Sequence, residues 1–152
     1  IRHENPDLLM LADSRRGPGH FPAVGLKMNR EEFAVLTGQA ADMRLPELCS
    51  AVGRLAADRG QAVFVSLSED GIAGAKPGGR PEHVPCLPVR GEIDIVGAGD
   101  AVMANLAMAL AAGAETGEAM RLAMAAASVV VHQLGTTGTA SLQDIRPLVC
   151  AH

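Results

Sequence analysis

One aspartate follows a glycine-rich turn at the start of an alanine-rich stretch. Residues Asp94 to Asp100 read DIVGAGD, and residues 102–112 are apolar apart from Asn105. Glycines that open a helix present backbone N–H groups to an anion, and small residues let a phosphate approach the backbone. The turn therefore predicts one of two things. Gly97, Ala98 and Gly99 bind a phosphate, or the glycines serve only the turn and the helix packing.

A dinucleotide-binding site of the Rossmann type is the weakest interpretation of this turn. Val102 stands where that fingerprint needs its third glycine, and a helix follows where a second strand ending in an acid is required. Asp100 would also repel a pyrophosphate. In phosphoryl transfer the same carboxylate is useful, because it can take the proton of an attacking hydroxyl while fixed donors stabilise the transferred group. Asp100 thus favours phosphoryl transfer.

The elements around this turn follow from apolar patterning. Short apolar or β-branched runs predict strands at 8–12, 23–27 and 61–67, a returning antiparallel strand at 72–75 and at best an edge strand within 83–89. Helical spacing and end signals predict helices from Asn29 to Gly38 and over 45–58, 116–134 and 142–149, together with a helix that continues from the glycine-rich turn to Ala112. This alternation indicates an α/β fold with a mostly parallel sheet.

Composition narrows the function classes. The 152 residues carry a net charge of −4 and only 2% aromatic residues, so neither a nucleic acid nor an anionic membrane surface is an expected partner. Cys49, Cys86 and Cys150 are odd in number and widely spaced, which favours free thiols in a reducing cytoplasm over a disulfide framework. The chain opens close to a strand and without Met, so we expect a segment of a longer protein.

Four segments, taken together, resemble the ribokinase-like (PfkB) carbohydrate kinases. Asp94–Asp100 resembles the family's DTxGAGD motif, Asn29–Glu32 its NxxE motif, Ser66–Gly71 its TLGxxG nucleotide turn and Leu122–Gly135 its alanine-rich adenine-side helix. Their order and spacing agree across nearly all of residues 1–152. Within the family, the amino-acid sequence is most similar to the heptose-7-phosphate kinase branch. The resemblance implies a partial three-layer α/β/α sandwich and an ATP-dependent kinase acting on a sugar or sugar phosphate.

The resemblance also implies a role for each matching residue. Asp100 is the base, and Gly97, Ala98 and Gly99 form the anion hole. Asn29 and Glu32 hold Mg²⁺ and phosphates, partly through water. The expected nucleotide contacts are Ser66, Ser68 and Gly71 at the phosphates and ribose, with Met124 and Gly135 near the adenine. Asp94 and Val96, with backbone around Val130, Gln133, Gly135 and Thr139, correspond to a loop that binds a monovalent cation such as K⁺.

Several positions depart from the family pattern and keep a second hypothesis open. Ile95 stands where Thr is usual, Met28 where Pro is usual, Ser68 where Gly is usual, and Met124 where Asn or His is common. The family's N-terminal half, with most sugar contacts and a lid, is not in the sequence. The alternative is a catalytically inactive nucleotide-binding or regulatory module. A sheet cut in this way leaves an unpaired strand, so a homodimer is a further expectation.

Three basic residues are not part of the predicted site. Arg15, Arg16 and Lys27 could meet a sugar phosphate, but basic side chains are more often solvated at the surface.

Overall fold

A single mixed sheet organises the chain. The computed structural model describes residues 4–5, 8–13, 20–21 and 23–150. Five strands lie in the order β1-β2-β3-β4-β5, with the bounds β1 Leu11–Asp13, β2 Gly25–Asn29, β3 Val63–Ser66, β4 Ile72–Ala75 and β5 Glu82–Val84. The pairs β1–β2 and β2–β3 are parallel, whereas β3–β4 and β4–β5 are antiparallel.

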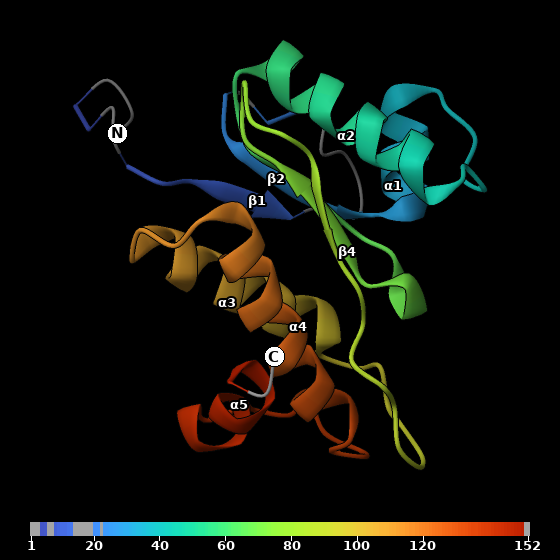
Figure 1. Cartoon of the computed structure of the whole chain (residues 1–152), viewed down its shortest axis with the longest axis vertical. Helices are drawn as coiled ribbons and strands as arrows, with labels where there is room; N and C mark the ends of the chain where they lie inside the picture. Colours follow the sequence, from blue (N-terminus) through green and yellow to red (C-terminus); the bar gives the residue numbers. More distant parts are fainter. Residues whose placement is uncertain (1–3, 6–7, 14–19, 22, 151–152) are drawn as a thin grey trace.

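Helices cover both faces of this sheet (Figure 1). On one face lie α1 (Arg30–Thr37) and α2 (Leu45–Arg59), and on the other lie α3 (Ala98–Ala111) and α4 (Thr116–Val131). The last helix, α5 (Leu142–Val149), packs on α4 through Ile145 and Ala125. The layers are α/β/α, as the sequence predicts.

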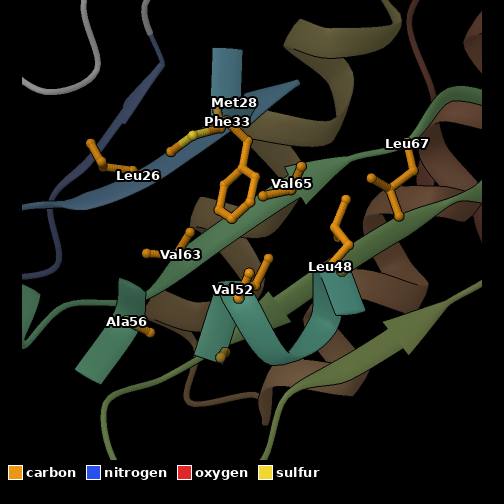
Figure 2. Packing of buried hydrophobic residues seen from close by; sticks show 12 residues of the cluster. Leu26, Met28, Phe33, Leu48, Val52, Ala56, Val63, Val65 and Leu67 are labelled. Atoms are coloured by element: carbon orange, nitrogen blue, oxygen red, sulfur yellow. The ribbon is translucent and has the colours of Figure 1, made fainter. Parts of the chain in front are cut away.

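Strand alternation divides the buried side chains between two cores. Leu26, Met28, Val63 and Val65 point toward α1 and α2, where they meet Phe33 and other apolar side chains (Figure 2). Phe64 and Ile72 point the other way and pack against α3 and α4. Since successive strand residues face opposite sides, the even-numbered positions of β2 build the first core. Its odd-numbered positions therefore face α3 and α4.

Helix ends follow local sequence signals. Asn29 caps α1, Ser141 caps α5 and Glu115 begins α4, each in a reciprocal capping box. Gly38 and Gly60 end α1 and α2 in the left-handed conformation that glycine adopts most easily. Gly97 begins α3 and supplies no side-chain cap. That open end lies within the predicted phosphate site.

The structure changes some predicted boundaries. The first strand runs over Leu11–Asp13 rather than 8–12, because β2 begins only at Gly25 and Leu8 and Leu9 lie exposed before the pairing starts. The α/β class is confirmed, but parallel and antiparallel pairs are equal in number rather than mostly parallel. The turn at Ser68–Gly71 is too short for a crossover, so β4 returns antiparallel to β3.

Candidate active site

The carboxyl ends of the three parallel strands carry polar side chains. Asp13 of β1 is paired in register with Lys27 of β2, and Asn29 of β2 with Ser66 of β3. Lys27 and Asn29 occupy the odd-numbered positions of β2, on the face that α3 and α4 cover. Ligands of open α/β sheets bind at the carboxyl ends of the strands. The row of polar residues therefore lies where a ligand is expected.

The N-terminus of α3 offers free backbone donors beside this row. Gly97 has φ of 84°, and a Cβ added to it would collide with the carbonyl oxygen of Thr137. The N–H of Ala98 donates to the carbonyl oxygen of Ile95 at 3.1 Å. Within the described part of the chain, no hydrogen bond is recorded for the N–H groups of Gly99 and Asp100. These two N–H groups, at an exposed helix start, can donate hydrogen bonds to an anion.

A cleft of 320 Å³ connects this helix start with the nucleotide turn. It contains six of the predicted site residues, namely Ser66, Ser68, Gly71, Ala98, Gly99 and Met124. Its apolar wall comes from the segment after β5 and from α4, including Cys86, Leu87, Val89, Ala127 and Val131. An apolar cleft with a few polar groups at one end fits a ligand that has a flat apolar part and a charged part.

The turn at Ser68–Gly71 has backbone features of its own. Ser66 Oγ donates to the Met28 carbonyl oxygen at 3.3 Å, which ties β3 to β2. Ser68 has φ of 53°, the only positive value among the described non-glycine residues. This conformation gives a physical reason why the family usually has glycine there. Gly71 has φ of 93°, and a Cβ on it would collide with the Val84 carbonyl oxygen.

Asn29 and Glu32 contact each other at the start of α1. The Glu32 N–H donates to Asn29 Oδ1 at 2.8 Å, and the Asn29 N–H donates to Glu32 Oε2 at 2.8 Å. The capping box uses only one of the two Glu32 carboxylate oxygens. Mg²⁺ in phosphate sites is commonly held by one or two carboxylates together with water and the phosphates themselves. The pair therefore fits a water-mediated Mg²⁺ contact, although it also has a purely structural task.

The expected monovalent-cation loop is drawn together by Asp94. Its carboxylate accepts the N–H of Val96 at 3.0 Å and the N–H of Gly135 at 3.1 Å. Gln133 exchanges two hydrogen bonds with the backbone of Thr139, at 2.7 and 2.9 Å. Segments 94–97 and 133–139 therefore form one loop cluster at the end of α4. This cluster contains the residues for which the family resemblance implies a monovalent-cation loop.

Other features of the surface lie away from these residues. A larger hollow of 500 Å³ between Lys76, Arg80 and Glu115 contains none of the predicted site residues. Among the described residues, no group of three His, Cys, Asp or Glu side chains could hold a metal ion. None of the described helices has both the length and the apolar character needed to cross a membrane.

Comparison with known families shows the family to which the chain belongs. A family profile described as "pfkB family carbohydrate kinase" matches residues 23–143. The chain belongs to the pfkB family of carbohydrate kinases. This match contains all four segments on which the family resemblance rests.

Curated relatives and solved structures agree with that assignment. The chain is 44% identical over 111 residues to a bifunctional protein HldE of Rhodopseudomonas palustris, covering 73% of this chain and 22% of that protein. It is 40% identical over 129 residues to HldE of Bradyrhizobium diazoefficiens, covering 84% and 25%. The resemblance to the heptose-7-phosphate kinase branch is thereby confirmed. The chain spans about a quarter of the length of these relatives.

Ribokinases have the same fold. Arabidopsis thaliana ribokinase, solved with ribose and ATP, superposes with a TM-score of 0.79 at 26% identity, covering 91% of this chain and 46% of that one. Thermotoga maritima ribokinase superposes with a TM-score of 0.74 at 19% identity, covering 98% and 51%. The predicted ribokinase-like fold is confirmed.

Two charged residues beside the candidate site, Lys27 and Arg30, are not among the predicted site residues. Lys27 is only 5% exposed and forms an ion pair with Asp13 at 2.8 Å, so it is not a solvated surface residue. Arg30 joins the α1 start to the nucleotide turn through Asp70, at 3.0 Å. The two-residue period of β2 could have placed Lys27 beside Asn29. Arg15 and Arg16 lie outside the described residues.

Proposed function

We propose that this chain is the C-terminal, nucleotide-binding portion of an ATP-dependent sugar kinase. The observation that carries the proposal is the cleft that joins the uncapped start of α3 to the Ser66–Gly71 turn. The family assignment and the HldE relatives supply the class of reaction, and they favour a heptose phosphate or a related sugar phosphate as acceptor.

Each end of the cleft has a task in this proposal. The adenine lies against the apolar wall near Met124 and Gly135, and the phosphates run along Ser66, Ser68 and Gly71 toward α3. In the turn formed by Gly97, Ala98 and Gly99, the N–H groups of Gly99 and Asp100 donate to the transferring phosphoryl group, because the Ala98 N–H already donates to Ile95. Asn29 and Glu32 would hold Mg²⁺, partly through water, and the ion would supply positive charge to the phosphates. The loop of Asp94 and Val96 would hold K⁺, which would help to order the neighbouring turn at Gly97.

Asp100 performs the proton transfer. Its carboxylate takes the proton of the sugar hydroxyl as that oxygen forms a bond to the γ-phosphorus of ATP, and the bond from phosphorus to the leaving oxygen of ADP breaks. The exposed position of Asp100 in the first turn of α3 leaves it accessible to a hydroxyl from the substrate side. The helix dipole stabilises a carboxylate in this turn.

The test is turnover of the natural full-length protein with a panel of sugar phosphates. Asp100→Asn should lower kcat by about a hundredfold or more, as expected when a general base is lost, and leave the Kd for MgADP unchanged. Asp58→Asn, an exposed aspartate near the end of α2, is the matched control and should behave as the natural protein. Undiminished turnover in Asp100→Asn would refute the assignment of the base.

One observation favours the second candidate, an inactive nucleotide-binding module. Ser68 brings a side chain and a left-handed backbone to a turn where the family usually has glycine. If the natural full-length protein binds MgADP but phosphorylates no sugar in the panel, that module is the better description. Substitution of Ser68 by Gly should then increase MgADP affinity.

A further inference from the structure

Arg30 connects three separate segments beside the cleft. It is the first residue of α1, directly after Asn29, and its guanidinium donates to the carbonyl oxygens of Met43 and Ala41, at 3.1 and 3.5 Å. The second terminal nitrogen of the guanidinium donates to Asp70 Oδ2 at 3.0 Å. The Arg30 side chain is 22% exposed, so most of it is removed from water. A planar guanidinium held by two carbonyls is a fixed anchor for the aspartate.

Asp70 is held at its backbone as well as at its carboxylate. His83 Nε2, on β5, donates to the Asp70 carbonyl oxygen at 2.6 Å, and Nε2 carries the proton because a carbonyl oxygen can only accept. The Asp70 N–H donates to the Leu67 carbonyl oxygen at 3.0 Å. The N–H of Gly71 donates to the Ser68 carbonyl oxygen at 3.1 Å. Contacts from outside the turn and hydrogen bonds within it therefore meet at this aspartate.

Ser68 has the backbone conformation in this turn that requires such support. Its φ of 53° lies in the left-handed region, which costs an L side chain free energy that glycine avoids. A strained conformation persists only where the surrounding structure determines it. Ser68 and Gly71 both line the cleft, so the conformation of the turn sets the shape of the cleft wall. Asp70 lies between them and links the turn to its surroundings.

We propose that Arg30 is a positioning residue for nucleotide binding, which acts through Asp70 to hold the Ser68–Gly71 turn in its cleft-facing conformation. The proposal rests on the proposed kinase function and adds a residue to it. Arg30 is not among the described residues that line the cleft, so its effect reaches the nucleotide through the turn. An exposed ion pair contributes little by itself. Here other contacts already restrict both partners, which lowers the entropic cost of holding them together.

Amide hydrogen exchange tests the effect on the turn without any ligand. Arg30→Met should raise the exchange rates of the Asp70 and Gly71 N–H groups by about tenfold, because both donate within the turn. Arg44→Met is the matched control and should leave these rates unchanged. Arg44 lies at the start of α2, pairs with Glu47 and has no recorded contact with the turn within the described residues. Unchanged rates in a folded Arg30→Met variant would overturn the proposal.

Nucleotide binding then tests the positioning role. Arg30→Met should raise the Kd for MgADP by about tenfold, whereas Arg44→Met should not change it. When Ser68→Gly is already present, Arg30→Met should raise this Kd by only about twofold, because glycine adopts the left-handed conformation without the cost that serine has. An arginine that merely supports the fold would raise the Kd equally with and without Ser68→Gly, and that result would contradict the proposal.

Asp70→Asn protects the test against misfolding. It keeps the shape of the side chain and removes its charge, so it should raise the same exchange rates even if Arg30→Met does not fold; unchanged rates would refute the proposal. Arg30→Met combined with Asp70→Asn should bind MgADP no more weakly than Arg30→Met alone. Additive losses would refute an action through Asp70.

The two measurements separate this proposal from the proposed function. If the exchange rates change as expected but the natural chain binds no MgADP, the kinase function fails, whereas the positioning of the turn by Arg30 stands. If the natural chain binds MgADP and Arg30→Met binds it equally well, the positioning role fails and the kinase function stands.

Discussion

The starts of α1 and α3 lie on opposite faces of the sheet, both near the carboxyl end of β2, and they differ in how their backbone donors are used. At α1, Asn29 and Glu32 occupy each other's backbone N–H groups in a complete capping box. At α3, Gly97 brings no side chain, and the N–H groups of Gly99 and Asp100 have no recorded partner within the described residues. One helix start is closed by its own sequence and the other is open.

This difference indicates two complementary binding surfaces. The start of α1 presents a carboxylate oxygen and suits a cation, whereas the start of α3 presents N–H groups and suits an anion. MgATP contains both kinds of group. The predictions that follow test each helix start separately.

The largest effect is expected at Gly97. Gly97→Ala should destabilise the chain by about 2–5 kcal/mol, because a left-handed alanine is strained and its Cβ collides with Thr137. Gly38→Ala is the matched control, since φ is 69° there but the Cβ meets no atom within 4 Å. Thermal unfolding compares the two variants. Equal losses of stability in Gly97→Ala and Gly38→Ala would mean that the turn before α3 is less tightly packed than described.

A smaller effect is expected at Glu32. Glu32→Gln keeps an amide oxygen for the capping box but removes the charge, so the Kd for MgADP should rise about tenfold while that for ADP with EDTA stays constant. Glu118→Gln removes the same charge from the capping box of α4 and should change neither value. If both variants bind MgADP as the natural chain does, Glu32 only caps α1.

The smallest effect concerns two thiols on opposite sides of the sheet. Burial raises the pKa of the Cys86 thiol, with a further increase from Glu69, and burial also raises the pKa of the Cys49 thiol. Both should therefore react slowly with iodoacetamide at pH 7 and faster as the pH rises. Bound MgADP should slow alkylation of Cys86 several-fold, since Cys86 lines the cleft.

Cys49 provides the internal control for this experiment. It lies on α2, packed against the first core and away from the cleft. Mass spectrometry of the alkylated chain should show no change at Cys49 when MgADP is added. Equal protection of both thiols would indicate a general tightening of the chain, and no protection of Cys86 would place the nucleotide elsewhere.

Local signals in the sequence were sufficient for most elements of the fold. Glycine caps and apolar spacing placed α1, α2 and α5 nearly at their observed bounds. The first strand was misplaced because its limits depend on where β2 begins, which is a tertiary property. The short turn before β4 was recognised, but its effect on the balance of parallel and antiparallel pairs was not.

Motif order predicted six of the residues that line the cleft, and the other lining residues depend on tertiary packing. The environment of Lys27 depends on three segments far apart in the sequence, namely β1, β2 and the start of α3. The general tendency of basic side chains to be solvated instead indicates a surface position for Lys27. The apolar wall at Cys86 and Leu87 comes from a proline-containing segment that the sequence predicts as an edge strand at best, and no local pattern indicates that it borders a cleft.

Calorimetric titration of the 152-residue chain with MgADP, and with ADP plus EDTA, tests the central claim most directly. The account predicts binding at one site that weakens when Mg²⁺ is removed, because the open start of α3 and the carboxylate of Glu32 act on the same nucleotide. A chain that unfolds cooperatively on heating, and is therefore folded, but releases no heat of binding at millimolar MgADP would contradict the account.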